Sequence, residues 1–520
     1  MKIAVIGAGS IGFTRGIVSD LLSVPEFRDN LDIAFTDISK RNLDMVYKIC
    51  RRDMEANGVR SKISATLDRR VAFKNADYVF CVVRVGGLEG FQTDIDIPLK
   101  YGVDQCVGDT LCAGGIMYAQ RGIAAMLGFC KDISEVAKPG CMLITHTNPM
   151  AMCTWACSKY GCGVPVVGLC HGVEGGHWQI ANVLGLEREE VDIICAGINH
   201  QTWYIQVRHK GKDLTGKLLA AFEKHPVYSR TEKVRIDMLR RFGYYSTESN
   251  GHLSEYVPWY RKRPKEIRKW IDLGSWINGE TGGYLRVCTE GRNWFETDFP
   301  NWMKGEPAKY DPARRGGEHG PYIIESLETG RRYRGHFNVM NNGCITNLPD
   351  DCCVEVPCYV DANGIGVPQV GDLPLGCAGV LNNTATVQRL GVEAAVNGDD
   401  MLLRQAMMLD PLTGAVCDPP EIWQMVDEML VAQAKWLPQY RKTITAAKKR
   451  LAKAKRSGTL IKTREGYKGA ARLHTKTVAE MKKNAAAARR SAAAAAADKP
   501  AEDRDKDAAK GKSRKKAKKK

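Results

Sequence analysis

Residues 1–13, MKIAVIGAGSIGF, contain the pattern that decides the fold. A short apolar run is followed by GAGSIG, which matches G-x-G-x-x-G and opens a helix-like stretch. Glycines at this spacing permit a tight turn and let backbone N–H groups reach a pyrophosphate at the N-terminus of the helix. The stretch therefore predicts a strand, a phosphate-binding turn and a helix, with candidate cofactor residues Gly7, Gly9, Ser10, Ile11 and Gly12.

Asp37 ends the second apolar run, about 25 residues beyond the last glycine of the turn. A carboxylate at this place can accept hydrogen bonds from ribose hydroxyls and repels a 2′-phosphate, which favours NAD over its phosphorylated form. The alternative is an ordinary strand–helix turn with an unrelated surface aspartate.

Six apolar runs alternate with helix-like segments through the first 196 residues: KIAVIG, LDIAFTD, ADYVFCVV, CMLITHTN, VPVVGLC and VDIICAGI. Continuous apolar runs suit parallel strands that are covered on both faces. The pattern predicts an α/β fold with a doubly wound, Rossmann-like parallel sheet of the lactate/malate dehydrogenase kind. We expect an NAD-binding domain over 1–196, an α+β substrate and metal domain over 197–439, and a disordered or solvated basic tail rich in Ala, Lys and Arg over 440–520.

Composition narrows the class of protein. The chain has 520 residues, no apolar run long enough to span a membrane, and a net charge of +17. The basic charge is confined to residues 441–520, so the rest of the chain is slightly acidic. The 18 cysteines are scattered through apolar segments without a regular spacing, which is typical of buried thiols in a reducing compartment. We therefore expect a cytoplasmic enzyme.

Three further segments fall where predicted strands end, which is where ligands bind in such sheets. They are Thr147-Asn148-Pro149, Cys170-His171-Gly172 and Asn199-His200. A thiolate and an imidazole from two strand ends could hold a transition metal such as Mn or Fe. Packing of an ordinary Cys and His is the alternative.

At these residues the chain resembles the family 4 glycoside hydrolases, and among them the melibiase-type α-galactosidases. The resemblance runs from Met1 to about Leu437 and includes GAGSIGFT, KYGVDQCVGDTLCAGGI, THTNPMAMCTWA, GLCHGVEG, AGINHQTWY, TESNGHLSEYVPWY, NLPDDCCVEVP and MLDPLTGAV. These motifs together are far more specific than the glycine pattern alone. The basic tail lies outside the resemblance.

The resemblance implies a glycosidase that requires NAD and a divalent metal, usually Mn²⁺. It assigns Cys170 and His200 as the metal ligands and places Asn148 against the substrate near the nicotinamide. The implied reaction is a redox-assisted elimination: oxidation at sugar C3, loss of the C2 proton, departure of the aglycone, addition of water and return of the hydride. Such a reaction does not need the pair of carboxylates used by most glycosidases.

The acid and the base are assigned by the same resemblance. His252 falls nearest the position of the base and Tyr256 is the second choice, with a structural role for His252 as the alternative. His171 follows the cysteine ligand, so we expect it to bind sugar hydroxyls or to move a proton. Asp109 lies on a loop expected to border the site, or else caps the helix that follows it.

Two departures from relatives bear on the substrate. Phospho-sugar members have an arginine where this chain has Phe91, which argues against a sugar phosphate. The motif Cys-His-Gly-Val has glycine where the compared α-galactosidases have serine. We expect an α-galactoside, and α-glucosides, α-glucuronides and α-galacturonides stay open. Arginines in candidate substrate loops could meet a carboxylate or be surface charge: Arg292, Arg314 and Arg315.

Two rival functions remain. A lactate- or malate-type dehydrogenase shares the nucleotide fold but does not need Cys170 with His200. A nucleic-acid-binding protein could act through the tail, but no aromatic residue interleaves the last 50 residues, so only weak polyanion binding is expected. The resemblance implies a homodimer or homotetramer acting on a small glycoside, with no membrane partner.

Overall fold

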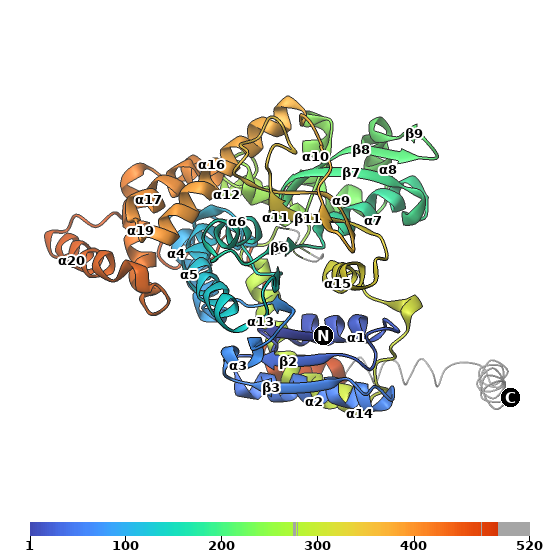
Figure 1. Ribbon diagram of the computed structural model, residues 1–520. Coiled ribbons are helices and arrows are strands. Elements are labelled where there is room, and N and C mark those ends of the chain that lie inside the picture. Colours follow the sequence, from blue (N-terminus) through green and yellow to red (C-terminus); the bar gives the residue numbers. More distant parts are fainter. Residues whose placement is uncertain (274–276, 278, 470, 487–520) are drawn as a thin grey trace. The chain divides into compact units, whose positions relative to one another are not determined.

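The computed structural model describes residues 1–273, 277, 279–469 and 471–486 (Figure 1). The chain divides into two compact units. The first comprises 1–286 and 306–473 and contains the sheet and the sites described below. The second comprises 287–305 and the described part of the chain from 474 onward.

The N-terminal half of the sheet is parallel. Its strands lie in the order β3-β2-β1-β4-β5-β6, and all five pairs are parallel. This order is that of a doubly wound dinucleotide-binding fold. The strands are β1 (Lys2–Ile6), β2 (Asp32–Thr36), β3 (Lys62–Thr66), β4 (Tyr78–Cys81), β5 (Met142–Thr145) and β6 (Val166–Leu169).

The same sheet continues beyond β6 as an antiparallel region in the order β11-β12-β7-β8-β10, with β9 on β8 and β13 on β12. Its strands are β7 (Asp192–Ile198), β8 (Gln201–His209), β9 (Lys212–Asp213), β10 (Tyr245–Ser246), β11 (Tyr333–Met340), β12 (Cys353–Asp361) and β13 (Gly364–Gly366). The parallel and antiparallel regions are therefore edge-to-edge parts of one sheet.

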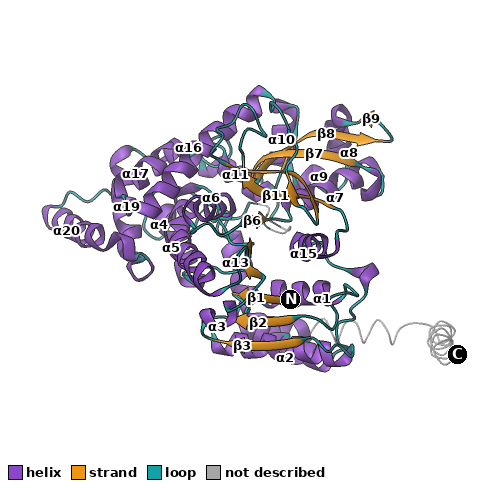
Figure 2. Ribbon diagram, in the orientation of Figure 1, coloured by secondary structure: helices purple, strands orange, loops and turns teal. Residues whose placement is uncertain are grey.

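Helices connect and cover these strands (Figure 2). In the first half they are α1 (Ile11–Leu22), α2 (Lys40–Ala56), α3 (Arg69–Phe73), α4 (Gly87–Lys100), α5 (Cys112–Val136), α6 (Met150–Tyr160), α7 (Gly172–Leu184), α8 (Leu218–Lys224), α9 (Tyr228–Thr231), α10 (Lys233–Phe242) and α11 (Asn250–Tyr256). The later ones are α12 (Pro264–Ile267), α13 (Gly283–Thr297), α14 (Phe299–Lys304), α15 (His319–Thr329), α16 (Leu375–Asn397), α17 (Asp400–Leu409), α18 (Pro411–Val416), α19 (Pro419–Ala432) and α20 (Arg441–Ser457). Single 3₁₀ turns are η1 (Arg188–Glu190), η2 (Thr215–Lys217), η3 (Pro312–Arg314), η4 (Ala434–Trp436) and η5 (Pro438–Tyr440).

Helix α5 shows how the site loop is fixed. It is buried along most of its length and packs against α4, α6 and α16. Its N-terminal residues join a large apolar cluster with α16, α17 and α19. The segment that leads into it, 104–111, is fully buried, so its side chains are held in place rather than exposed to solvent.

The doubly wound fold and the six predicted strands are confirmed, with two differences. β3 was not predicted, because this edge strand is largely exposed and its sequence KISAT lacks a long apolar run. The last predicted run, β7, pairs antiparallel with β8 and β12 instead of joining the parallel strands. Burial on both faces produces the same apolar pattern in either kind of sheet.

The domain limits predicted at 196 and 439 stay predictions. Helix α20 lies inside the predicted tail, but Ile444 and Ala447 are buried and Arg450 pairs with Asp427 of α19 at 2.7 Å. This part of the tail is therefore an ordered helix. The predicted disorder of residues 487–520 concerns residues outside those described. No helix of the described chain is long and apolar enough to cross a membrane.

Candidate functional site

The turn after β1 has the geometry that its glycines predict. Gly7 has φ of +84°, and a Cβ there would lie 2.7 Å from the carbonyl oxygen of Val82. Any side chain would collide with the neighbouring strand end and strain the backbone. The turn is held by hydrogen bonds from the N–H groups of Gly7 and Ala8 to the carbonyl of Thr36.

Asp37 closes this turn from the end of β2. Its Oδ2 accepts a hydrogen bond from the N–H of Gly9 at 2.9 Å and its Oδ1 accepts one from the N–H of Ser39 at 2.7 Å. Each carboxylate oxygen keeps a lone pair for a ribose hydroxyl. A Cβ at Gly9 would lie 2.8 Å from Oδ2, so the close approach requires glycine.

Helix α1 begins at Ile11, directly after the turn, and Gly12 lies in its first turn. Ser10 stands at the N-cap, but its side chain makes no capping hydrogen bond, and the first turn holds no acidic residue. The N–H groups at the start of the helix thus have no competing anion, which suits a pyrophosphate. All six predicted cofactor residues come together here and fit a dinucleotide.

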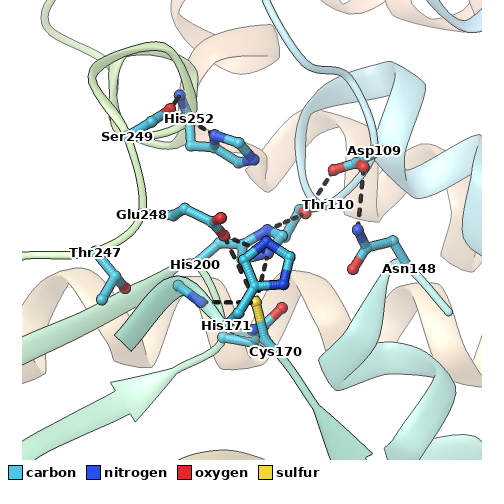
Figure 3. A network of polar contacts seen from close by, with 12 residues as sticks. Asp109, Thr110, Asn148, Cys170, His171, His200, Thr247, Glu248, Ser249 and His252 are labelled. Atoms are coloured by element: carbon cyan, nitrogen blue, oxygen red, sulfur yellow. Dashed lines mark hydrogen bonds and ion pairs between the residues drawn. The ribbon is translucent and has the colours of Figure 1, made fainter. Parts of the chain in front are cut away.

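A second cluster forms around His200, which occupies the two-residue hairpin between β7 and β8. Its Nε2 lies 3.4 Å from Sγ of Cys170 and 2.7 Å from Oε2 of Glu248, and Sγ and Oε2 are 3.6 Å apart (Figure 3). Thiolate, imidazole and carboxylate side chains all bind transition metals. The structure therefore brings the two predicted ligands together and adds a carboxylate.

The backbone at His200 is strained, with φ of +66°. A non-glycine residue in the left-handed region costs of the order of 1–3 kcal/mol and persists where the surrounding structure demands it. This conformation lets the tight hairpin aim the imidazole at the end of β6, where Cys170 follows Leu169.

A hydrogen-bonded chain orients His200 from behind. Thr110 Oγ1 donates to Asp109 Oδ1 at 3.0 Å and lies 2.8 Å from Nδ1 of His200. Since the threonine proton is directed to the carboxylate, its oxygen accepts from the Nδ1–H. Nε2 then faces Cys170 and Glu248, and a bound metal would take the place of its proton.

Asp109 also connects the cluster to the predicted substrate residue. Its Oδ2 accepts hydrogen bonds from Asn148 Nδ2 at 3.1 Å and from Arg84 Nη2 at 3.3 Å. Asp109 is fully buried and does not cap α5, whose N-cap is Leu111. The prediction that it borders the site is therefore favoured over the capping alternative.

The charges in the cluster are strongly coupled. Burial raises the pKa of the Cys170 thiol to about 12. Burial by itself would lower the pKa of His200, but the Glu248 carboxylate holds it well above its usual value. Burial by itself would raise the pKa of Glu248, but His200 holds it well below its usual value. A bound cation reverses this for the thiol, because coordination favours the thiolate.

His252 lies next to the cluster on α11. Its ring meets that of His200 edge-on with centroids 4.8 Å apart, and its Nδ1 lies 2.6 Å from Ser249 Oγ. Burial lowers the pKa of His252 to about 4, so the ring is neutral near pH 7. Tyr256, one helical turn on, is fully buried, and its ring stacks parallel to that of His200 at 6.5 Å.

His171 stands apart from the other candidates because its side chain is 60% exposed. Its Nδ1 lies 3.6 Å from Glu318 Oε1, and this contact raises the pKa of His171 to about 9. The other oxygen of Glu318 lies 3.5 Å from Nδ1 of the buried His146. Glu318 thus joins two histidines at the carboxyl ends of β5 and β6.

Arg84 and the three arginines predicted in substrate loops differ in their surroundings. The guanidinium of Arg84 lies over the ring of Phe91, 4.2 Å from its centroid, beside Asp109. Arg315 pairs with Glu325 and stacks on Tyr322, and Arg314 lies 3.8 Å from Asp311. Arg292 belongs to the second unit. Arg314 and Arg315 therefore have carboxylate partners within the chain.

Sequence reasoning missed Glu248, Thr110 and Glu318. Glu248 directly precedes the Ser249–Tyr256 motif, so a search for carboxylates beside that motif could have found it. Thr110 lies inside the GDT motif, next to Asp109. No signal in the sequence marks Glu318, since only the packing of the segment before α15 against the ends of β5 and β6 gives it a role.

Comparisons with known proteins agree with this geometry. The profile described as "Family 4 glycosyl hydrolase" matches residues 2–186, and that of the "Family 4 glycosyl hydrolase C-terminal domain" matches 195–413. The chain is 56% identical to an α-galactosidase of Rhizobium meliloti over 92% of its length and 97% of the relative. It is 32% identical to an α-galactosidase of Bacillus subtilis over 85% of its length and all of that protein.

A solved structure is similar as well. It is a 6-phospho-α-glucosidase from gut microorganisms in complex with NAD and glucose-6-phosphate. The match has a TM-score of 0.70 and 26% identity, and it covers 85% of this chain and 100% of the other.

Proposed function

The chain belongs to the family 4 glycosyl hydrolases, and from that premise we propose that it is an NAD- and divalent-metal-dependent α-galactosidase. The observation that carries the proposal is the convergence of Cys170 and His200, from two strand ends, in a chain so similar to an α-galactosidase. A dehydrogenase acting on hydroxy acids would need the nucleotide turn but not this cluster.

Each cofactor has a place in the first unit. The turn at residues 7–12 with Asp37 would hold NAD, and Cys170 with His200 would hold the metal, for which we propose Mn²⁺. When bound, NAD supplies a reversible hydride acceptor for sugar C3 and the metal supplies positive charge beside the O2 and O3 oxygens. The remaining work belongs to side chains of the protein.

Asn148 would position the sugar. Its Nδ2 is fixed by Asp109, which leaves its carbonyl oxygen to accept from a sugar hydroxyl. Because the same aspartate receives the Thr110 proton, the orientations of Asn148 and His200 are coupled. Asp109 would thus orient both Asn148, which contacts the substrate, and His200, which binds the metal.

His252 would take the proton from sugar C2. Its ring is neutral, lies beside His200, and is oriented by Ser249 through Nδ1. A general base must lie within hydrogen-bonding reach of the proton it removes, and a sugar whose O2 and O3 were held beside His200 would bring C2 toward the neighbouring His252. Tyr256 is the second choice, because it is fully buried and its ring lies farther from that of His200 than the ring of His252 does.

His171 would meet the sugar from the exposed side. Glu318 holds the ring and its proton, so His171 is ready to donate to a sugar hydroxyl or to the leaving oxygen. Phe91 is fully buried under the guanidinium of Arg84, and that cation already donates to Asp109 within the chain. A neutral galactoside fits these features.

The test is release of p-nitrophenol from its α-galactoside, with and without NAD, Mn²⁺ and a reductant. The α-glucoside and α-glucuronide serve as parallel substrates. We expect release from the galactoside only when both cofactors are present, without accumulation of NADH. Steady NADH formation from free sugars or hydroxy acids without cleavage would instead establish a dehydrogenase.

We also propose a cytoplasmic enzyme that assembles as a homodimer or homotetramer and whose basic tail binds polyanions weakly. The excess of basic residues in the tail is larger than the net charge of the whole chain, +17, and such binding falls steeply with salt. Size-exclusion chromatography with light scattering tests the assembly. Elution from heparin at moderate salt, with turnover unchanged, would fit the role proposed for the tail.

A further inference from the structure

We propose that Glu248 is a third protein ligand of the divalent cation, together with Cys170 and His200. The inference rests on the proposed function, since family membership supplies the cation and the first two ligands. It adds a residue that the sequence motifs did not single out.

The distances support a single ion-binding position. Metal–ligand bonds of about 2.0–2.3 Å at angles of about 90–110° separate neighbouring ligand atoms by about 3–3.7 Å. The three separations are 2.7 Å, 3.4 Å and 3.6 Å among Nε2, Sγ and Oε2. One point can therefore lie within bonding distance of all three atoms after shifts of a few tenths of an ångström.

The approach of Glu248 depends on a neighbouring glycine. A Cβ at Gly172 would lie 2.9 Å from Oε2 of Glu248. The glycine leaves room for the carboxylate beside Cys170, whose Sγ accepts a hydrogen bond from the N–H of Gly172 at 3.4 Å.

A second group of ligand types, Asp109 with His200 and His252, is less suited to the cation. Asp109 already accepts hydrogen bonds from Arg84, Asn148 and Thr110. A cation there would face the positive charge of Arg84 at close range. On that side His200 presents Nδ1, whose proton goes to Thr110.

Charge balance favours the same choice. A divalent cation bound by one thiolate and one neutral imidazole keeps one unit of uncompensated positive charge. Glu248 adds the second negative charge, so the buried centre becomes neutral. Since an unpaired charge is costly to bury, the carboxylate stabilises the bound ion. The mixed sulfur, nitrogen and oxygen set leaves further positions open for substrate oxygens.

The experiment measures Mn²⁺ affinity by electron paramagnetic resonance on the NAD-loaded enzyme, without substrate. We expect Glu248→Gln to weaken Mn²⁺ binding at least about 100-fold, and Glu248→Asp to weaken it less. Glu318→Gln is the matched control, because it removes a carboxylate that contacts His171 and His146 but none of the three ligands. It should change the affinity less than about threefold.

An unchanged Mn²⁺ affinity in Glu248→Gln would overturn the inference. If turnover were also lost, Glu248 would be acting on a substrate proton instead. NAD affinity of each variant shows whether the first unit is folded. Should Glu248→Gln fail to fold, the anomalous signal from crystals of the wild-type enzyme soaked in Mn²⁺ decides: it should lie within about 2.5 Å of all three ligand atoms, and a position bonded only to Cys170 and His200 would contradict the inference.

The measurements of Mn²⁺ affinity do not depend on which sugar the enzyme cleaves. An enzyme that binds Mn²⁺ through Glu248 but fails to cleave the α-galactoside would defeat the proposed function alone. Cleavage with full Mn²⁺ affinity in Glu248→Gln would defeat the inference alone.

Discussion

The glycine turn after β1 and the cluster around His200 are both candidate cofactor sites, but the chain builds them differently. The turn is formed by the backbone of six consecutive residues, 7–12, and by one carboxylate at the end of the next strand. The cluster uses side chains that lie far apart in the sequence, such as those of Asp109 and Glu248. The fold brings their segments together around His200. Added bulk close to the turn should therefore disrupt the backbone site, whereas a change in the chemistry of a ligand should disrupt the side-chain site.

The sharpest test of that contrast is Cys170→Ser. Replacing the thiolate by a neutral hydroxyl removes a charged ligand, which is worth several kcal/mol of cation and transition-state binding. We expect kcat/KM for the α-galactoside to fall at least about 1000-fold, with NAD affinity retained. Cys162→Ser, at an exposed cysteine, is the control and should keep the wild-type rate. Wild-type activity in Cys170→Ser would exclude this cysteine as a ligand.

The reciprocal change is Gly9→Ala. The added Cβ would lie 2.8 Å from Asp37 Oδ2 and 2.9 Å from Asn42 Cβ, so the turn must open. We expect NAD to bind about 30- to 100-fold more weakly, a loss of about 2–3 kcal/mol, while Mn²⁺ affinity stays unchanged. Gly16→Ala, on the same helix with nothing within 4 Å of its Cβ, should bind NAD normally. Equal NAD binding in both variants would refute the close-approach argument.

A smaller effect is expected from Thr110→Val, which removes the group that orients His200. Losing the partner of a metal-binding imidazole weakens metal binding about 10- to 100-fold, and we expect the lower end because Asp109 remains nearby. Calorimetric titration with Mn²⁺ measures it. Thr110→Ser keeps the hydroxyl and should restore the affinity; if it does not, the effect comes from packing and not from the hydrogen bond.

The smallest effect should follow removal of residues 487–520, because the two sites as described use no residue of this segment. Turnover should stay within about twofold of the full chain, and heparin binding should weaken. Truncation before α20 is different, because Ile444, Ala447 and the Arg450–Asp427 pair pack this helix on the first unit. A loss of thermal stability only in the longer deletion would place the end of the folded region beyond α20.

The two regions also differ in what could be predicted from sequence. The shape of the nucleotide turn could be predicted from sequence, because its residues are adjacent and local steric constraints explain its glycines. Cys170 and His200 followed from strand ends and from family resemblance. Glu248 and Thr110 did not, since their roles depend on where the segments meet in space. Glu318 lies more than 140 residues from the histidine that it holds.

The strand pattern had a similar limit. Apolar runs revealed β1, β2 and β4 to β7, yet burial on both faces made β7 resemble a parallel strand. The exposed edge strand β3 gave no such signal. Periodicity therefore located the strands with buried faces but not the direction in which they pair.

The central claim is that the glycoside is cleaved through loss of its C2 proton, with NAD bound at the glycine turn and the metal bound at the cluster around His200. The most direct measurement is hydrolysis of an α-galactoside in D₂O with NAD and Mn²⁺, followed by NMR of the released galactose at C2. We expect deuterium at C2 in the product, formed at the same rate as the aglycone and absent without NAD. Full cleavage that leaves only hydrogen at C2 would contradict the account.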